Sequence, residues 1–220
     1  ELPVLKEAGR PIIVNIAFET LADLEKALEV LNRSASKISA LELNVSCPNV
    51  SKGGMTWGID PDSLKSAVTT ARSSWDGALW VKLSPQVPSV AEFAWLSQEC
   101  GADAVVVSNT WLGAAIDNER ERPVFEKVFA GLSGPAIFSL ALRAVWEAYG
   151  AVEIPVVGCG GISRPQDALS MILAGASAVE VGTVLFVDSR LPAMICREIE
   201  QHLGKKGLSA VGDLTGRARR

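Results

Sequence analysis

Short apolar segments alternate along the chain with longer stretches in which apolar positions recur at helical spacing. Six apolar runs have the length and β-branched content of strands, and the amphipathic stretches between them predict helices. The apolar runs lack alternation, which indicates strands covered on both faces of a parallel sheet. The predicted strands span residues 11–16, 40–45, 78–83, 103–108, 154–158 and 178–181, and the predicted helices span residues 21–33, 61–73, 90–100, 134–149 and 164–174.

Strands that alternate with helices predict an α/β fold built from βα units. A helix end, a Gly-Ala pair and a strand follow one another twice, at residues 100–105 and 174–179, as at the junctions of a barrel. Two long connections, residues 46–60 and 110–133, follow the carboxyl ends of strands, where α/β barrels carry their active-site loops. Because no low-complexity linker divides the chain, we predict a single barrel domain over residues 1–220.

Composition and charge exclude several classes of function. The chain of 220 residues is 48% hydrophobic and carries a net charge of −4, with no basic stripe of the kind that binds nucleic acid. No apolar run approaches the roughly 20 residues that span a bilayer, so no membrane segment is expected. Four scattered cysteines and one histidine do not form a local metal or iron–sulfur motif, and they favour a reducing, cytoplasmic location.

Candidate chemical groups follow the predicted strands. Cys47 lies in the segment NVSCPN, residues 44–49, where a thiol could abstract a proton, although an isolated cysteine in an Asn/Pro turn is more often structural. Lys82 lies inside an otherwise apolar predicted strand, and a ligand explains a lysine there better than a side chain that snorkels at a strand end does. A weaker signal follows the next strand, in Ser108, Asn109 and Thr110.

Glycines follow the last two predicted strands, in the segments GCGGI at residues 158–162 and VGT at residues 181–183. Glycine lets backbone amides approach a phosphate, with a helix N-terminus behind them, and barrels commonly bind phosphate after their last two strands. One glycine pair is uninformative, but two such sites separated by a helix and a strand are moderately specific. Together with a lysine, two asparagines and a cysteine, they predict FMN chemistry.

These motifs resemble those of the dihydroorotate dehydrogenases, specifically the class 1B catalytic subunits, along essentially the whole chain. The resemblance is carried by PIIVNIA, LELNVSCPNVSKGGMTWGIDP, WVKLSPQV, GLSGPAI, IPVVGCGGI and AGASAVEVGT. SCPN followed by GGM, KLSP and a late GGI is highly specific to this flavin family. The resemblance implies a (β/α)8 TIM barrel that oxidises (S)-dihydroorotate to orotate in pyrimidine biosynthesis.

The resemblance also implies roles for individual residues. Cys47 would be the base that removes a proton from dihydroorotate while FMN accepts the hydride. Lys82 would stabilise the negative charge of reduced FMN, and Asn15 would contact the isoalloxazine ring. The substrate would be bound by Asn44, Asn109 and Thr110. FMN would be held by Asn15, Asn44, Lys82, Ser108, Gly134, Gly160, Gly161, Gly182 and Thr183, and no metal is expected.

In the class 1B pattern, electrons leave to a separate subunit that carries FAD and an iron–sulfur cluster and serves NAD, and the catalytic chain forms a homodimer. The chain departs from the family in three places: Phe18 replaces a usual Gly, Phe138 a usual Lys and Ser108 a usual Ile. The family's first two βα units have no counterpart in these residues. We therefore expect an N-terminally incomplete barrel.

Two alternatives remain open at this point. A pyrimidine-reducing flavoprotein of the dihydropyrimidine dehydrogenase type shares the NxSCP loop, but it usually has His after the Pro, where this chain has Asn49. A truncated, non-catalytic barrel could bind flavin weakly or act as a scaffold.

Overall fold

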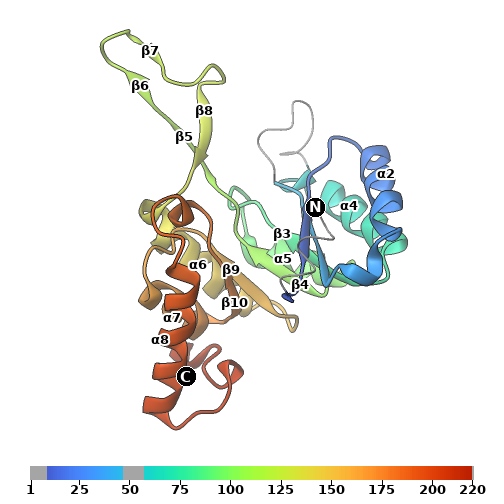
Figure 1. Cartoon of the computed structure of the whole chain (residues 1–220). Coiled ribbons are helices and arrows are strands. Elements are labelled where there is room, and N and C mark those ends of the chain that lie inside the picture. The colour runs from blue at the N-terminus through green and yellow to red at the C-terminus, as the bar shows by residue number, and fades with distance from the viewer. Residues whose placement is uncertain (1–8, 47–56, 220) are drawn as a thin grey trace. The chain divides into compact units, whose positions relative to one another are not determined.

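The computed structural model describes residues 9–46 and 57–219, and the chain forms two compact units (Figure 1). The first unit comprises Glu1–Val106 and Gly150–Pro155, and the second comprises Val107–Tyr149 and Val156–Arg220. Both units contain parallel strands connected through helices, which confirms the predicted α/β class.

The sheet of the first unit has the strand order β1-β2-β3-β4, and every neighbouring pair is parallel. Each connection contains a helix, because parallel neighbours need a long crossover. All four strands lie within the segments predicted from the sequence. The elements are β1 (Ile13–Ile16), α2 (Leu21–Asn32), η1 (Ala35–Lys37), β2 (Ala40–Asn44), α4 (Pro61–Ser74), β3 (Ala78–Lys82), α5 (Val90–Glu99) and β4 (Ala104–Val107).

The three described α-helices of the first unit, α2, α4 and α5, each begin at a side chain that accepts a hydrogen bond from the first turn. Thr20 and Asp23 form a reciprocal capping box at the start of α2. Asp60 caps α4, with a proline at the first helical position, and Ser89 caps α5. These residues satisfy backbone amides that have no partner inside the helix, so the local sequence fixes where the helices start.

The two faces of the first unit's sheet differ in chemistry. Leu41, Leu43 and Val81 are fully buried, whereas the alternate positions on the same strands carry polar residues such as Glu42 and Lys82. Successive side chains of a strand point to opposite faces, so the polar residues share one face. The prediction that the strands are covered on both faces is confirmed for β2, of which residues 40–43 are buried, but one face of β2 and β3 carries charged and amide side chains in place of apolar ones.

In the second unit, β9 pairs with β10 in parallel, and α7 packs against both α6 and α8. α8 was not among the helices predicted from the sequence, because only Leu191 and Ile195 of its residues are buried and its apolar pattern is weak. The elements are β5 (Trp111–Ala114), β6 (Ile116–Asp117), β7 (Arg122–Pro123), β8 (Phe129–Leu132), η2 (Pro135–Ile137), α6 (Phe138–Tyr149), β9 (Val156–Cys159), α7 (Pro165–Ala174), β10 (Ala176–Glu180), η3 (Thr183–Phe186), α8 (Leu191–Lys206), η4 (Val211–Asp213) and η5 (Arg217–Arg219).

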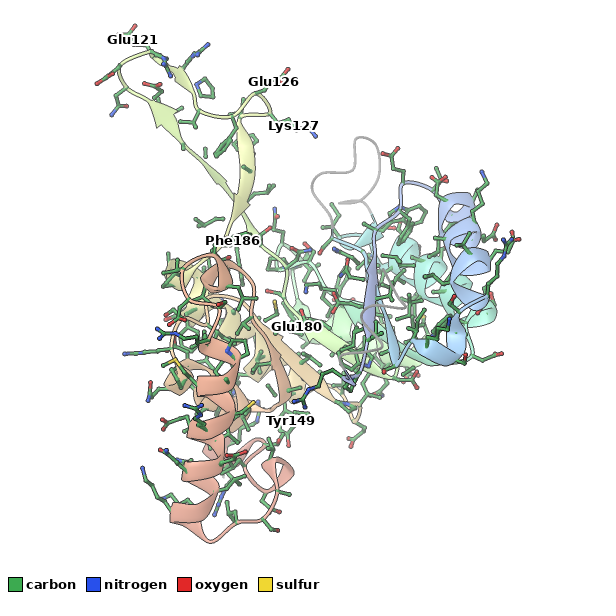
Figure 2. All side chains as sticks on the ribbon, viewed as in Figure 1. Glu121, Glu126, Lys127, Tyr149, Glu180 and Phe186 are labelled. Carbon is green, nitrogen blue, oxygen red and sulfur yellow. The ribbon has the colours of Figure 1, made fainter. Side chains whose placement is uncertain are left out.

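Residues 110–133, expected to be an irregular loop, form a β-hairpin instead. β5 pairs with β8 and β6 pairs with β7, both antiparallel, and the hairpin extends away from the helices of its unit (Figure 1). The strands have two to four residues, and Leu112 pairs with Gly131, so no apolar–polar alternation marks them in the sequence. Glu121 lies near the hairpin's tip, with Glu126 and Lys127 farther along it (Figure 2).

No helix within residues 9–46 and 57–219 combines the length and the apolar character needed to cross a membrane.

Candidate functional site

Polar side chains from three adjacent strands of the first unit meet on one face of the sheet. The strand register pairs Asn15 with Glu42, and it pairs Asn44 with Lys82. Glu42 and Asn44 lie two positions apart on β2 and therefore point to the same face. The structure thus brings together Asn15, Asn44 and Lys82, which the sequence singled out. It also adds Glu42, which the sequence reasoning missed, although a glutamate inside an apolar strand was a visible signal.

Hydrogen bonds connect these side chains in a series in which each amide donates toward Glu42. Asn15 Nδ2 donates to Glu42 Oε1, and Lys82 Nζ lies 3.3 Å from the same oxygen. Asn44 Nδ2 lies 3.5 Å from Asn15 Oδ1, to which it donates. The backbone amide and the hydroxyl of Ser46 both approach Asn44 Oδ1 to 3.3 Å.

The ion pair in this cluster is largely buried. Only 4% of the Glu42 side chain and 13% of the Lys82 side chain are exposed. Two charges removed from water are tolerated only with close pairing and further hydrogen bonds, and such a pair adds little to stability compared with apolar residues. A buried pair on the polar face of the sheet is therefore better explained by a ligand than by folding.

Cys47, the predicted base, lies outside the described residues, which stop at Ser46 and resume at Trp57. A Cβ on Gly58 would lie 2.6 Å from the carbonyl oxygen of Val45, so the chain returns close to the end of β2. Phe18 is 4% exposed, and its ring centroid lies 5.5 Å from that of Trp57. Phe18, a departure from the family pattern, thus fills a buried position beside the residues that follow the Cys47 segment.

A second cluster of predicted residues lies in the second unit, where the loops after β8, β9 and β10 meet. Thr183 Oγ1 donates to Ser133 Oγ over 2.9 Å, which brings Gly134 near the Gly182–Thr183 pair. Gly161 has a φ of +72°, and a Cβ there would lie 2.5 Å from the amide nitrogen of Phe138. Only glycine fits such a left-handed, close-packed position.

Gly182 differs from Gly161. A Cβ on Gly182 would meet no described atom within 4 Å. This glycine therefore leaves space next to the backbone, as the approach of a ligand requires. The loop glycines consequently have two roles: Gly161 lets the protein pack, and Gly182 keeps a surface of the backbone open.

Asp167 holds the start of α7. Its carboxylate accepts hydrogen bonds from the amides of Ser163 and Arg164 at 3.0 and 3.2 Å, and from the side chains of both residues. Burial raises the pKa of Asp167, but these hydrogen bonds outweigh it and hold the pKa below its ordinary value of 3.8. Asp167 therefore fixes the two residues that lead into α7, the helix whose N-terminus was expected behind the phosphate.

The predicted group after β4 is held against the neighbouring strands of the second unit. The amide of Ser108 donates to the carbonyl of Cys159 over 2.8 Å, and only 1% of Ser108 is exposed. Asn109 Oδ1 accepts from the amide of Thr110 at 2.8 Å. A Cβ on Gly131 would lie 2.6 Å from Thr110 Oγ1, so Thr110 sits directly against β8.

Among the described residues, no group of three or more His, Cys, Asp or Glu side chains could hold a metal ion.

Comparisons with known proteins place these features in context. The dihydroorotate dehydrogenase family model matches residues 2–203. Two curated relatives, each named dihydroorotate dehydrogenase B (NAD(+)), catalytic subunit, come from Porphyromonas gingivalis and Trichlorobacter lovleyi. They are 42% and 43% identical to this chain over 97% and 98% of its length, and it covers 69% and 71% of theirs. A crystal structure of DHODH from Eimeria tenella in complex with ferulenol has a TM-score of 0.78 at 25% identity; the match covers 94% of this chain and 61% of that one.

Proposed function

Because the chain belongs to the dihydroorotate dehydrogenase family, we propose that it oxidises (S)-dihydroorotate to orotate in pyrimidine biosynthesis, with FMN as its cofactor. One observation carries the proposal beyond family membership. Asn15, Asn44 and Lys82, which are 67 residues apart from first to last, meet on one face through strand register. This is the donor group that the family resemblance assigns to flavin and substrate.

The chemistry of the described residues suits FMN. The pyrimidine edge of a flavin is rich in hydrogen-bond acceptors, and the first cluster offers amide N–H groups and an ammonium. A phosphate suits backbone amides beside glycines, and Gly182 leaves room for one. When bound, FMN accepts the hydrogen and the electrons that the substrate loses. Further cofactor contacts are proposed for Ser108, Gly134, Gly160, Gly161 and Thr183.

The candidate site residues then have distinct roles in this reaction. Cys47 removes a proton from a ring carbon of the substrate. Asn44, three positions earlier in the sequence, binds the substrate together with Asn109 and Thr110. The ammonium of Lys82 stabilises the negative charge that reduction places on the flavin, and its burial strengthens that interaction.

The curated relatives favour this reaction over pyrimidine reduction, because they are named dihydroorotate dehydrogenases over nearly the whole chain. Asn49 in place of the His of pyrimidine-reducing relatives agrees with that choice. The remaining alternative is a non-catalytic barrel. Measurements of bound flavin and of turnover distinguish it from the proposed enzyme.

We also propose that the chain works in the cytoplasm as a homodimer with an electron-transfer subunit that carries FAD and an iron–sulfur cluster and passes electrons to NAD. The names of the relatives support this, since they are catalytic subunits of NAD(+) enzymes. Large apolar side chains on the second unit also favour contact with another chain: Phe186 is 95% exposed and Val187 is 88% exposed.

Orotate formation from dihydroorotate by the complete protein tests the reaction, and its visible absorption spectrum tests for bound flavin. We expect Cys47→Ala to retain flavin and to lose turnover. Cys196→Ala is the matched control, because Cys196 is an exposed thiol on α8, and it should leave both readouts unchanged. A flavin-loaded protein that forms no orotate overturns the proposed reaction, and a colourless, inactive protein supports the non-catalytic alternative.

A further inference from the structure

We propose that Glu42 is a positioning residue, which orients the amides of Asn15 and Asn44 and the ammonium of Lys82 toward the flavin. The inference rests on the proposed function, because it takes FMN as the ligand of this cluster. It assigns a role to a residue that the sequence motifs did not single out.

The position of Glu42 makes this role possible. It lies in the middle of β2, and the register pairs it with Asn15 on β1 and with Trp80 on β3. Lys82 follows Trp80 by two positions and therefore points to the same face of the sheet. The carboxylate, 4% exposed, is thus held by two strands that flank its own.

An ionised carboxylate accepts hydrogen bonds and donates none. Glu42 therefore determines whether the Nδ2 or the Oδ1 atom of a neighbouring asparagine faces it. Asn15 must present Nδ2 to Glu42, which turns its Oδ1 toward the Nδ2 of Asn44. Asn44 in turn presents Oδ1 to Ser46. The carboxylate of Glu42 therefore determines the orientation of the side-chain amides of Asn15 and Asn44.

Glu42 also limits the freedom of Lys82. A lysine side chain has four rotatable bonds and loses considerable entropy when a ligand immobilises it. Lys82 Nζ already lies 3.3 Å from Glu42 Oε1, and only 13% of the side chain is exposed. The contact with Glu42 therefore restricts where the ammonium can lie.

The consequence is a fixed set of donors in place of an adaptable polar surface. A ligand with a row of acceptor atoms, such as the pyrimidine edge of a flavin, gains from donors that need no reorientation. If Glu42 were an amide, it could donate as well as accept, and the asparagine amides could face either way.

Glu42→Gln keeps the size of the side chain and removes its obligatory acceptor character. We expect the variant of the complete protein, stripped of flavin, to bind FMN on the order of 10- to 100-fold more weakly, as judged by quenching of FMN fluorescence. Glu29→Gln is the matched control: it makes the same chemical change on α2, where the side chain is 73% exposed, and it should bind FMN like the wild type.

A double-mutant cycle separates positioning from a general structural effect. If Glu42 acts through Lys82, then Lys82→Met and the double variant Glu42→Gln/Lys82→Met bind FMN with dissociation constants within about 3-fold of each other. Fully additive losses in the double variant contradict positioning through Lys82. If Glu42→Gln alone fails to fold, the comparison of Lys82→Met with the double variant still tests the proposal, because a double variant that binds FMN much more weakly than Lys82→Met contradicts positioning through Lys82.

Failure of the two proposals can be told apart. A wild-type protein that binds no FMN overturns the proposed function, and the inference about Glu42 with it. A wild-type protein that binds FMN, together with a folded Glu42→Gln variant that binds it equally well or more tightly, overturns the positioning role alone.

Discussion

The hydroxyl of Thr183 donates to the hydroxyl of Ser133 over 2.9 Å and joins two loops that lie 50 residues apart in sequence. Each loop carries a glycine assigned to FMN, Gly134 in one and Gly182 in the other. The contact joins the two loops through side chains of the protein itself. The FMN phosphate that we propose for this site would meet backbone amides held in place by this contact.

Thr183→Val tests this join, because valine keeps the shape of threonine and removes the hydroxyl. A net hydrogen bond contributes about 0.5–1.5 kcal/mol, so we expect FMN affinity to fall roughly 2- to 10-fold in a titration followed by flavin fluorescence. Thr69→Val is the control, since Thr69 makes its hydroxyl contacts on the exposed face of α4. Unchanged affinity in Thr183→Val would show that the two loops need no such join.

The two glycines of the second cluster should respond differently to alanine. At Gly161, φ is +72° and the new Cβ would lie 2.5 Å from backbone, so Gly161→Ala should lower the melting temperature markedly. At Gly182 the new methyl group meets no described atom within 4 Å. Gly182→Ala should therefore keep the melting temperature and weaken FMN binding, because it fills the space beside the phosphate.

Gly212→Ala serves as the control for both variants. A Cβ there also meets no described atom within 4 Å, but Gly212 lies in η4, outside the cluster. We expect it to change neither the melting temperature nor FMN affinity. If Gly182→Ala binds FMN as tightly as Gly212→Ala does, the open face of Gly182 is not part of the phosphate site.

Much of this arrangement was predictable from the sequence, because strand ends and helix starts are determined by residues that are close together in the sequence. Asn15, Asn44 and Lys82 each stand at or near the end of an apolar run, and parallel strands bring such ends to one edge. The glycines after β9 and β10 were visible for the same reason. The positions of both clusters followed from order along the chain.

Other features depend on contacts that the sequence does not display. Glu42 was counted as part of an apolar strand, and only the register shows that it lies beside Asn15 and near Lys82. The hairpin of residues 110–133 is defined by antiparallel pairing between short strands, not by alternation within one. Asp167 was not singled out from the sequence, because only the folded chain shows its contacts with Ser163 and Arg164.

Asp103 joins the start of β3 to α4 and provides a test of stability away from both clusters. Its Oδ2 accepts from the amide of Leu79 at 2.8 Å and from Arg72 Nη1 at 3.0 Å. Asp103→Ala removes both bonds and should lower the free energy of unfolding by about 1–3 kcal/mol. Asp103→Asn keeps an acceptor for Leu79 and loses a partly exposed ion pair, so it should cost less than about 1 kcal/mol. Urea denaturation measures both; equal losses would contradict this assignment.

The lowered pKa of Asp167 leads us to expect that the stability of the folded chain depends on pH. The hydrogen bonds from Ser163 and Arg164 outweigh the effect of burial and lower its pKa below 3.8 in the folded chain, so the unfolded chain takes up the proton first as the pH falls. The stabilisation is therefore complete at neutral pH and is lost as the pH falls through 3.8 toward the lower pKa of the folded state. Asp167→Asn should lower the free energy of unfolding by about 1 kcal/mol at pH 7, and less at pH 3. Urea denaturation at both pH values, with Asp76→Asn at an exposed aspartate as the control, measures the difference. A loss in Asp167→Asn that is the same at both pH values would mean that the carboxylate charge does not stabilise the start of α7.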